Sequence, residues 1–268
     1  HFRLAGARGR DCVMTITNAS DVNLRRLGGR GDMDDCWTGY RAVASYDLET
    51  WFRVDTSYDG RELTIRHRPE RDAIHFAQFA PYSNERHAAL VARTAVRPGV
   101  RLSVLGRTVE GRDVDLLTIG DPGVGRASCW FLARQHPNET QGSWFMEGFL
   151  DRLTDPDDAL ARQLRRKAVF RIVPNMNPDG VARGQTRMNA AMANLNREWL
   201  EPSTERSPEV ALVRAAMGEA GIDFLFDAHA DADLTFVFLG GAQPFPGLTA
   251  RQTALFERFE AAFAAANP

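Results

Sequence analysis

The stretch SCWFLARQHPNETQGSWFMEGFLDRLT, residues 128–154, decides the fold class of this chain. It opens with an apolar run of strand length and then passes through a short polar cluster. From residue 140 onward, Trp144, Phe149 and Leu153 recur at helical spacing, which predicts an amphipathic helix. A buried strand that is followed at once by an amphipathic helix is typical of α/β domains.

The same alternation continues along the chain. Two more apolar strands are predicted, AVFRIVP at 168–174 and IDFLFDAHA at 222–230. Helix-start signals lie between the strands, because Asp155 and Ser207 each precede a proline and so predict an N-cap and a first helical position. Buried strands that alternate with helices indicate a mostly parallel mixed sheet with helices on both faces. An Ala-rich segment at 250–267 predicts one further amphipathic helix.

The first part of the chain has a different pattern. Short apolar runs, such as CVMTITNAS (12–20) and LTIRHRP (63–69), are separated by Gly, Asp and Asn, which indicates a small β-sandwich. Residues 83–94 predict a connecting helix, and Pro98 with the glycine after it marks a boundary. We therefore expect an N-terminal β-sandwich domain and an α/β domain, at 1–98 and 99–268.

Composition and charge exclude several classes of partner. The 268 residues are 44% hydrophobic and 25% charged, the balance of a globular protein. Lys and Arg number 33 and Asp and Glu 35, so the net charge is 33 − 35 = −2. This charge provides no broad basic field for nucleic acid or an anionic membrane. No apolar stretch approaches the roughly 20 residues of a membrane span. We expect neither a nucleic-acid nor a membrane partner.

Cysteine usage suggests the compartment. Cys12, Cys36 and Cys129 are odd in number, and their spacing matches no zinc or redox motif. Reduced thiols in a reducing environment are the simplest interpretation, so we expect a cytoplasmic protein.

Two predicted strand ends carry potential metal ligands. His136 and Glu139 follow the first strand in the cluster HPNE, and His229 ends the strand at 222–230. Ligands of open α/β sheets bind at the carboxyl ends of the strands. Two histidines and one carboxylate with a fourth position open for water form a catalytic zinc arrangement. Taken separately, HPNE also fits a solvated loop, and His229 fits a hydrogen-bonded residue without a ligand.

Other polar residues lie near these ends in the sequence. Asp227 is either an acceptor for an imidazole N–H or a surface carboxylate. The run NPDG at 177–180 is a turn by its own chemistry, and Arg187 and Arg197 follow it. Two arginines near a metal could bind a carboxylate or stabilise an oxyanion, whereas without a metal each fits a solvated surface charge.

The order of these motifs resembles the zinc metallocarboxypeptidases. Within that family, the nearest resemblance is to the cytosolic carboxypeptidase branch, which includes tubulin deglutamylases and carries a small β-sandwich before the catalytic domain. The resemblance is specific over about residues 130–230 and looser before them. The motifs that carry it are HPNE (136–139), VPNMNPDGVARGQTR (173–187), NLNREW (194–199) and DAH (227–229).

The resemblance implies a carboxypeptidase fold and roles for individual residues. One Zn²⁺ per chain would be held by three ligands, His136, Glu139 and His229. Arg187 matches the arginine that polarises the scissile carbonyl and stabilises the oxyanion. Asn196 and Arg197 match the pair that holds the terminal carboxylate of the substrate, a planar group that suits a guanidinium fork.

The sequence departs from the family pattern in two ways. Asn194 replaces the family's usual Asp, and Met192 replaces a Gly. In addition, the family's general-base Glu is not found, because Glu257 and Glu260 fall on the outer face of the helix predicted at 250–267. Both ends of the chain look cut, so we expect a fragment.

The resemblance therefore implies a zinc-dependent enzyme that removes the C-terminal residue of a peptide or protein, with an expected preference for glutamate. Two alternatives stay open. One is an N-acyl amino acid deacylase of the same fold, and the other is an inactive module that binds zinc or a C-terminal tail.

Overall fold

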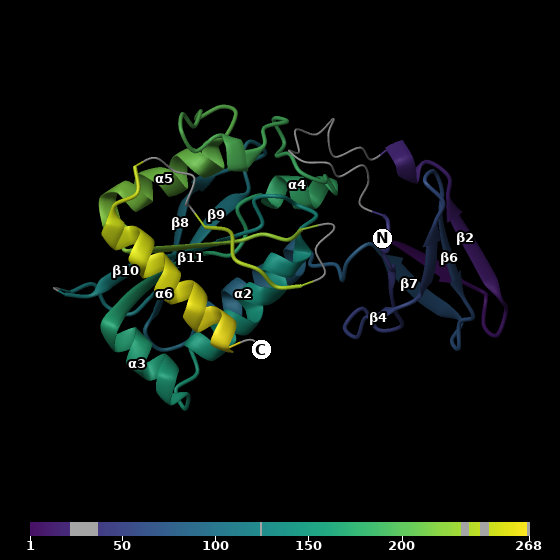
Figure 1. The fold of residues 1–268 in the computed structure, drawn as a ribbon, viewed down its shortest axis with the longest axis horizontal. Coiled ribbons are helices and arrows are strands. Elements are labelled where there is room, and N and C mark those ends of the chain that lie inside the picture. Colours follow the sequence, from purple (N-terminus) through teal and green to yellow (C-terminus); the bar gives the residue numbers. More distant parts are fainter. Residues whose placement is uncertain (22–36, 124, 232–235, 242–246, 267–268) are drawn as a thin grey trace. The chain divides into compact units, whose positions relative to one another are not determined.

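The computed structural model describes residues 1–21, 37–123, 125–231, 236–241 and 247–266. The chain divides into two compact units, His1–Ala232 and Asp233–Pro268. The first unit holds all of the strands described below, and the described residues of the second unit include one helix. Figure 1 shows the elements with the labels used here.

Two small antiparallel sheets form the N-terminal part of the first unit. One has the strand order β1-β7-β3-β4 and the other β2-β6-β5. Ala44, Ile74 and Phe76 of the first sheet and Ile65 of the second are buried in one shared core, so the expected β-sandwich is confirmed. The strands are β1 (Phe2–Ala5), β2 (Cys12–Ile16), β3 (Val43–Ser45), β4 (Phe52–Arg53), β5 (Asp55–Tyr58), β6 (Leu63–His67) and β7 (Ala73–Ala77), and η1 (Ala19–Asp21) is a short 3-10 turn.

A five-stranded mixed sheet organises the rest of the first unit. Its order is β12-β10-β11-β9-β8, and β10 is parallel to β11 and to β12. Only β9 runs against the others, since it is antiparallel to both β11 and β8. The mostly parallel mixed sheet is therefore confirmed. Its strands are β8 (Val100–Arg107), β9 (Asp113–Ile119), β10 (Ala127–Ala133), β11 (Ala168–Val173) and β12 (Phe224–Ala228).

Helices cover both faces of this sheet. On one face, Leu90 of α1 (Asn84–Ala95) and Met146 and Leu150 of α2 (Thr140–Leu153) join the core with apolar side chains of the strands. On the other face, Val210 and Val213 of α5 (Pro208–Ala220) pack with a second set of strand residues. Successive residues of a strand point to opposite faces of the sheet, so in β10 Phe131 packs in the core with α1 and α2 and Trp130 packs in the core with α5.

The helix α3 (Ala159–Lys167) begins later than the sequence predicts. Asp158, not Asp155, is its N-cap, because the Asp158 carboxylate accepts the N–H of Ala161 at 2.8 Å. Asp155 instead accepts the N–H of Asp157 at 2.8 Å and closes a local turn that contains the proline. The expected N-cap at Asp155 is therefore wrong.

Three shorter or later elements complete the description. The helix α4 (Pro178–Arg183) and the 3-10 turn η2 (Leu195–Arg197) lie between β11 and α5. In the second unit, α6 (Ala250–Ala266) confirms the helix expected there and has no buried residue.

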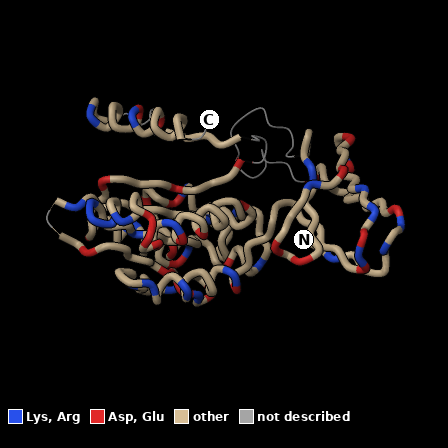
Figure 2. Tube along the Cα trace, turned by 90° about the horizontal axis from the view of Figure 1, so that it is seen from below, with Lys and Arg blue, Asp and Glu red and all other residues tan. Residues whose placement is uncertain are grey.

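The remaining features of the fold are its helix hydropathy, its charge distribution and its cysteines. No helix in the described residues is long and apolar enough to cross a membrane. Basic and acidic residues are interspersed along the described trace (Figure 2). Cys12 and Cys129 are free thiols, and Cys36 lies outside the described residues.

Candidate metal and active site

The loop that carries HPNE begins with an unusual backbone conformation directly after β10. Arg134 has a φ of 63°, a left-handed conformation that non-glycine residues rarely adopt. Its buried guanidinium holds the loop from inside, donating from Nε to the Pro137 carbonyl at 2.8 Å and from a terminal nitrogen to Ser143 Oγ at 2.8 Å. Burial lowers the pKa of Arg134 to about 10, so the side chain remains a cation at neutral pH. Arg134 thus fixes the turn that brings the HPNE segment back toward α2.

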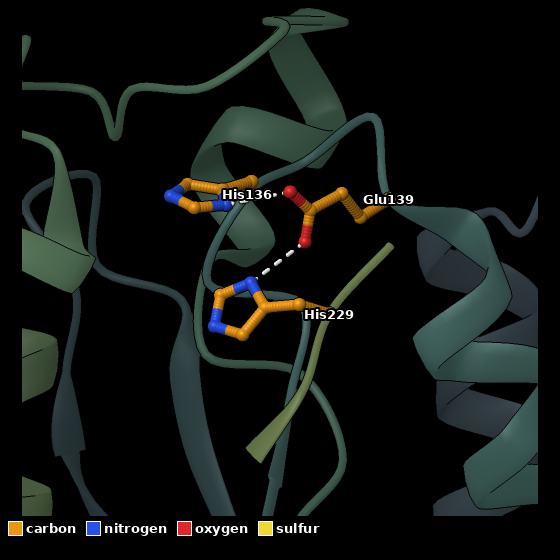
Figure 3. Close-up of side chains that lie close together, drawn as sticks. All are labelled: His136, Glu139 and His229. Atoms are coloured by element: carbon orange, nitrogen blue, oxygen red, sulfur yellow. Dashed lines mark hydrogen bonds and ion pairs between the residues drawn. The ribbon is translucent and has the colours of Figure 1, made fainter. Parts of the chain in front are cut away.

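His136, Glu139 and His229 converge on one point at this edge of the sheet (Figure 3). Nδ1 of His136 lies 2.7 Å from one carboxylate oxygen of Glu139, and Nδ1 of His229 lies 2.8 Å from the other. One candidate ligand atom from each residue lies within 4.8 Å of the others. The structure therefore brings together three side chains that come from two separate strand ends.

The charges of this cluster are strongly coupled. Burial alone would raise the pKa of Glu139, but hydrogen bonds from His136 and His229 outweigh it and lower that pKa to about 2. Burial would lower the pKa of His229, but hydrogen bonds to Asp227 and Glu139 raise it to about 10. Without a cation, Glu139 is a carboxylate and His229 is an imidazolium. A bound metal ion would take the place of the protons that the Nδ1 atoms hold toward Glu139.

The donor set fits zinc. Two imidazole nitrogens and one carboxylate are the protein ligands of many catalytic zinc sites, which keep a further position open. The Nε2 atoms of both imidazole rings already have other partners. Nε2 of His136 lies 3.1 Å from Asn194 Oδ1, and Nε2 of His229 lies 3.0 Å from Asp227 Oδ2. These contacts favour a proton on each Nε2 and leave each Nδ1 available to a metal.

The NLNREW segment lies beside both histidines. Leu195, buried in the core against α5, anchors the turn η2. Asn194 contacts His136 as described, and the amide nitrogen of Asn196 lies 3.5 Å from Nε2 of His229. Arg197 is exposed and donates to the carbonyl of Asn196 at 2.9 Å. Thus the amide of Asn196 is adjacent to the cluster, while the Arg197 side chain is open to solvent.

Arg187 is half-buried close to the cluster. Burial lowers its pKa; the negative charge of Glu139 opposes this shift, and the positive charge of Arg197 adds to it. Among the described residues, its buried Nε has no hydrogen-bond partner. A buried N–H without a partner is costly, so this donor is available to a ligand.

The turn NPDG connects the cluster to the rest of the unit. The side chain of Asn177 caps α4 by accepting the N–H of Gly180 at 2.9 Å, and its amide donates to the carbonyl of Gln135 at 3.0 Å. Gly180 is required here, because a Cβ would clash with the Pro137 ring and lie 2.8 Å from the Met188 carbonyl. The HPNE loop and the segment leading to Arg187 therefore pack directly against this turn.

Sequence reasoning missed several residues that support the cluster. Arg134 follows an apolar strand, where an arginine is usually exposed, so nothing in the local pattern indicates its burial. Asp179 is also fully buried and accepts hydrogen bonds from Thr108 at 2.8 Å and Arg112 at 2.7 Å. Glu257 and Glu260 are exposed on α6 of the second unit.

Comparisons with known proteins agree with this fold. Residues 1–79 match the model of the cytosolic carboxypeptidase N-terminal domain, and residues 88–230 match that of the zinc carboxypeptidases. The chain therefore belongs to the zinc carboxypeptidase family.

Three similar proteins illustrate the match. An uncharacterized protein of Zymomonas mobilis is 46% identical over 268 residues, which is 100% of this chain and 67% of the relative. A crystal structure of a putative carboxypeptidase from Burkholderia mallei has a TM-score of 0.92 and 48% identity, covering 99% of this chain and 67% of that one. A metallo-carboxypeptidase from Pseudomonas aeruginosa, solved in complex with (2-guanidinoethylmercapto)succinic acid, has a TM-score of 0.90 and 43% identity, covering 98% of this chain and 68% of that one. The chain thus spans about two thirds of the length of these proteins.

Proposed function

We propose that this protein is a zinc-dependent carboxypeptidase that hydrolyses the C-terminal peptide bond of peptides or proteins. The observation that carries the proposal is the pair of Nδ1 atoms, from His136 and His229, that face the two oxygens of the Glu139 carboxylate at 2.7 and 2.8 Å. Membership of the zinc carboxypeptidase family supports it independently.

In this proposal, His136, Glu139 and His229 hold one Zn²⁺ per chain. When bound there, zinc would supply a Lewis acid that activates water for attack on a carbonyl. Arg187 would donate from Nε, which has no partner within the described parts of the chain, to the oxygen that becomes negatively charged during hydrolysis. Asn196 and Arg197 hold the terminal carboxylate of the substrate, where a guanidinium offers two parallel donors.

We also propose that C-terminal glutamate is the preferred leaving residue. The positive charge of Arg197 lowers the pKa of Arg187, so two guanidinium groups act on the same region of the site, and this positive charge would favour an acidic leaving residue. A C-terminal glutamate presents two carboxylates, one at the chain end and one on the side chain.

The proposed partner is the C-terminus of a peptide or protein, with no nucleic acid and no membrane. The proposed location is the cytoplasm, supported by the match to the N-terminal domain of the cytosolic carboxypeptidases.

The proposal is tested with zinc-loaded protein and peptides that differ only in the last residue, which is Glu, Lys or Phe. Release of the free amino acid is measured, with C-terminally amidated peptides as the matched control. We expect release from the free acids, fastest for Glu, and none from the amides or with His136→Ala. Faster turnover of an N-acyl amino acid than of any peptide would favour a deacylase instead. Binding of zinc without any release would favour a binding module.

A further inference from the structure

A chain of hydrogen bonds connects the NLNREW segment to His229, which directly follows β12. The indole N–H of Trp199 donates to Oε1 of Gln135 at 2.9 Å. The amide nitrogen of Gln135 donates to Oδ2 of Asp227, and the same oxygen lies 3.0 Å from Nε2 of His229. Gln135 at the middle of this chain is fully buried, while Trp199, Asp227 and His229 are partly exposed.

The direction of each hydrogen bond in this chain is fixed by chemistry. An indole N–H only donates, so the Gln135 atom that faces Trp199 must be the carbonyl oxygen. The Gln135 amide group must then face Asp227, whose carboxylate only accepts. A rotated amide would place two donors together at Trp199 and two oxygens together at Asp227. The hydrogen bond from Trp199 therefore fixes the orientation of the Gln135 amide. Gln135 in turn holds the Asp227 carboxylate beside Nε2 of His229.

We propose that Trp199 and Gln135 are positioning residues for the metal ligand His229. They hold Asp227 so that it accepts the Nε2 proton of the ring, and this leaves Nδ1 facing Glu139 and the metal position. The inference rests on the proposed zinc site and adds two residues that reach His229 only through Asp227. Partners of this kind commonly change metal affinity by 10- to 100-fold.

The substitution Trp199→Phe tests the proposal because it removes the indole donor and keeps an aromatic ring. The matched control is Trp144→Phe in α2, which loses a similar indole hydrogen bond, to the Ala80 carbonyl at 3.1 Å, away from the cluster. The dissociation constant of zinc is measured by competition with a chromophoric chelator, and thermal unfolding of the metal-free proteins shows that both variants fold. We expect zinc affinity to fall about 10-fold in Trp199→Phe and to stay at the wild-type value in Trp144→Phe.

A double-mutant cycle separates positioning from general destabilisation. With Asp227→Asn as the background, Trp199→Phe should have little further effect on zinc affinity, because the group that it positions has already changed. Equal zinc affinity in wild type and Trp199→Phe would overturn the inference and leave the proposed function intact. Loss of zinc affinity in Trp199→Phe without any peptidase activity in the wild type would support the inference and overturn the proposed function. A wild-type protein that binds no zinc would overturn both.

Discussion

Glu209 is a fully buried carboxyl group in the first turn of α5, away from the proposed zinc ligands. One of its oxygens accepts the amide N–H of Asn189 at 3.2 Å, and among the described residues the other has no partner. Burial is the main cause that raises its pKa, to about 7, and the negative charge of Asp179 adds to this shift. Asn189 also accepts the backbone N–H groups of Ala191 and Ala193, so it organises the loop before η2.

This raised pKa gives folding stability a pH dependence. The folded-state pKa of Glu209 lies above its unfolded-state value of about 4.5. The protonated carboxyl group therefore contributes its full stability to the folded state below about pH 4.5, and this contribution is lost as the pH rises through about 7. We expect Glu209→Gln to raise the free energy of unfolding at pH 8.5 by about 2–3 kcal/mol and to change it little at pH 4.5. Urea unfolding at the two pH values measures this difference. The exposed Glu219 of the same helix supplies the control, Glu219→Gln, and an equal effect of Glu209→Gln at both pH values would contradict the assignment.

Arg187 provides a second test at the residue scale. Its Nε has no partner among the described residues, so in the proposed reaction it donates most strongly when negative charge develops on the substrate. We expect Arg187→Met to lower kcat by about 10²- to 10³-fold on a peptide substrate. Steady-state kinetics measure kcat, and the dissociation constant of zinc should stay unchanged. A rise in KM alone would indicate that Arg187 binds the ground state instead.

The candidate ligands could be identified from the sequence because each follows an apolar strand. His136 and Glu139 are three residues apart, and the parallel pairing of β10 with β12 brings His229 to the same edge. Gln135 and Trp199 could not be identified in this way. Their partners are distant in sequence, and a polar residue after a strand is equally typical of a solvated loop.

At the scale of elements, the helix α2 contains two glycines with different surroundings. A Cβ on Gly142 would lie 2.9 Å from the carbonyl oxygen of Ala228, at the end of β12. A Cβ on Gly148 would contact nothing within 4 Å. The first glycine thus permits the close approach of α2 to the strand that leads to His229, while the second only weakens the helix.

The two glycines predict opposite outcomes for the same substitution. We expect Gly148→Ala to raise the free energy of unfolding by about 1 kcal/mol, because alanine is the better helix former. Gly142→Ala should lower it by about 1–3 kcal/mol, since a backbone carbonyl must move to make room. Chemical denaturation of both variants provides the measurement. A stabilised Gly142→Ala would mean that α2 can move away from β12 without cost.

Helix boundaries show why sequence patterns locate elements better than their ends. The strands and helices of the mixed sheet follow from apolar periodicity, which packing on two faces reinforces. The start of α3 does not, because Asp155 and Asp158 both precede possible helical residues. Asp158 becomes the N-cap because its carboxylate reaches the N–H of Ala161, a choice that depends on backbone geometry.

At the scale of the whole molecule, the proposed zinc ion would couple metal concentration to stability. A ligand that binds only the folded state at 1,000 times its dissociation constant stabilises that state by about 4 kcal/mol. For a domain of this size, we expect zinc to raise Tm by on the order of 10 °C over the metal-free protein. Calorimetry with and without zinc measures the shift. Glu139→Gln should show a much smaller shift, and an equal shift in that variant would indicate binding elsewhere.

The separation of the candidate ligands along the chain has a consequence for how the protein folds. Glu139 and His229 contact each other although 90 positions separate them, and His136 meets Asn194 across 58. Closing such long loops is slow, and it requires that β10, β11 and β12 have already paired. A metal ion would therefore find its complete ligand set only late in folding. The bound ion would therefore slow unfolding of the native state and would have little effect on the rate of folding.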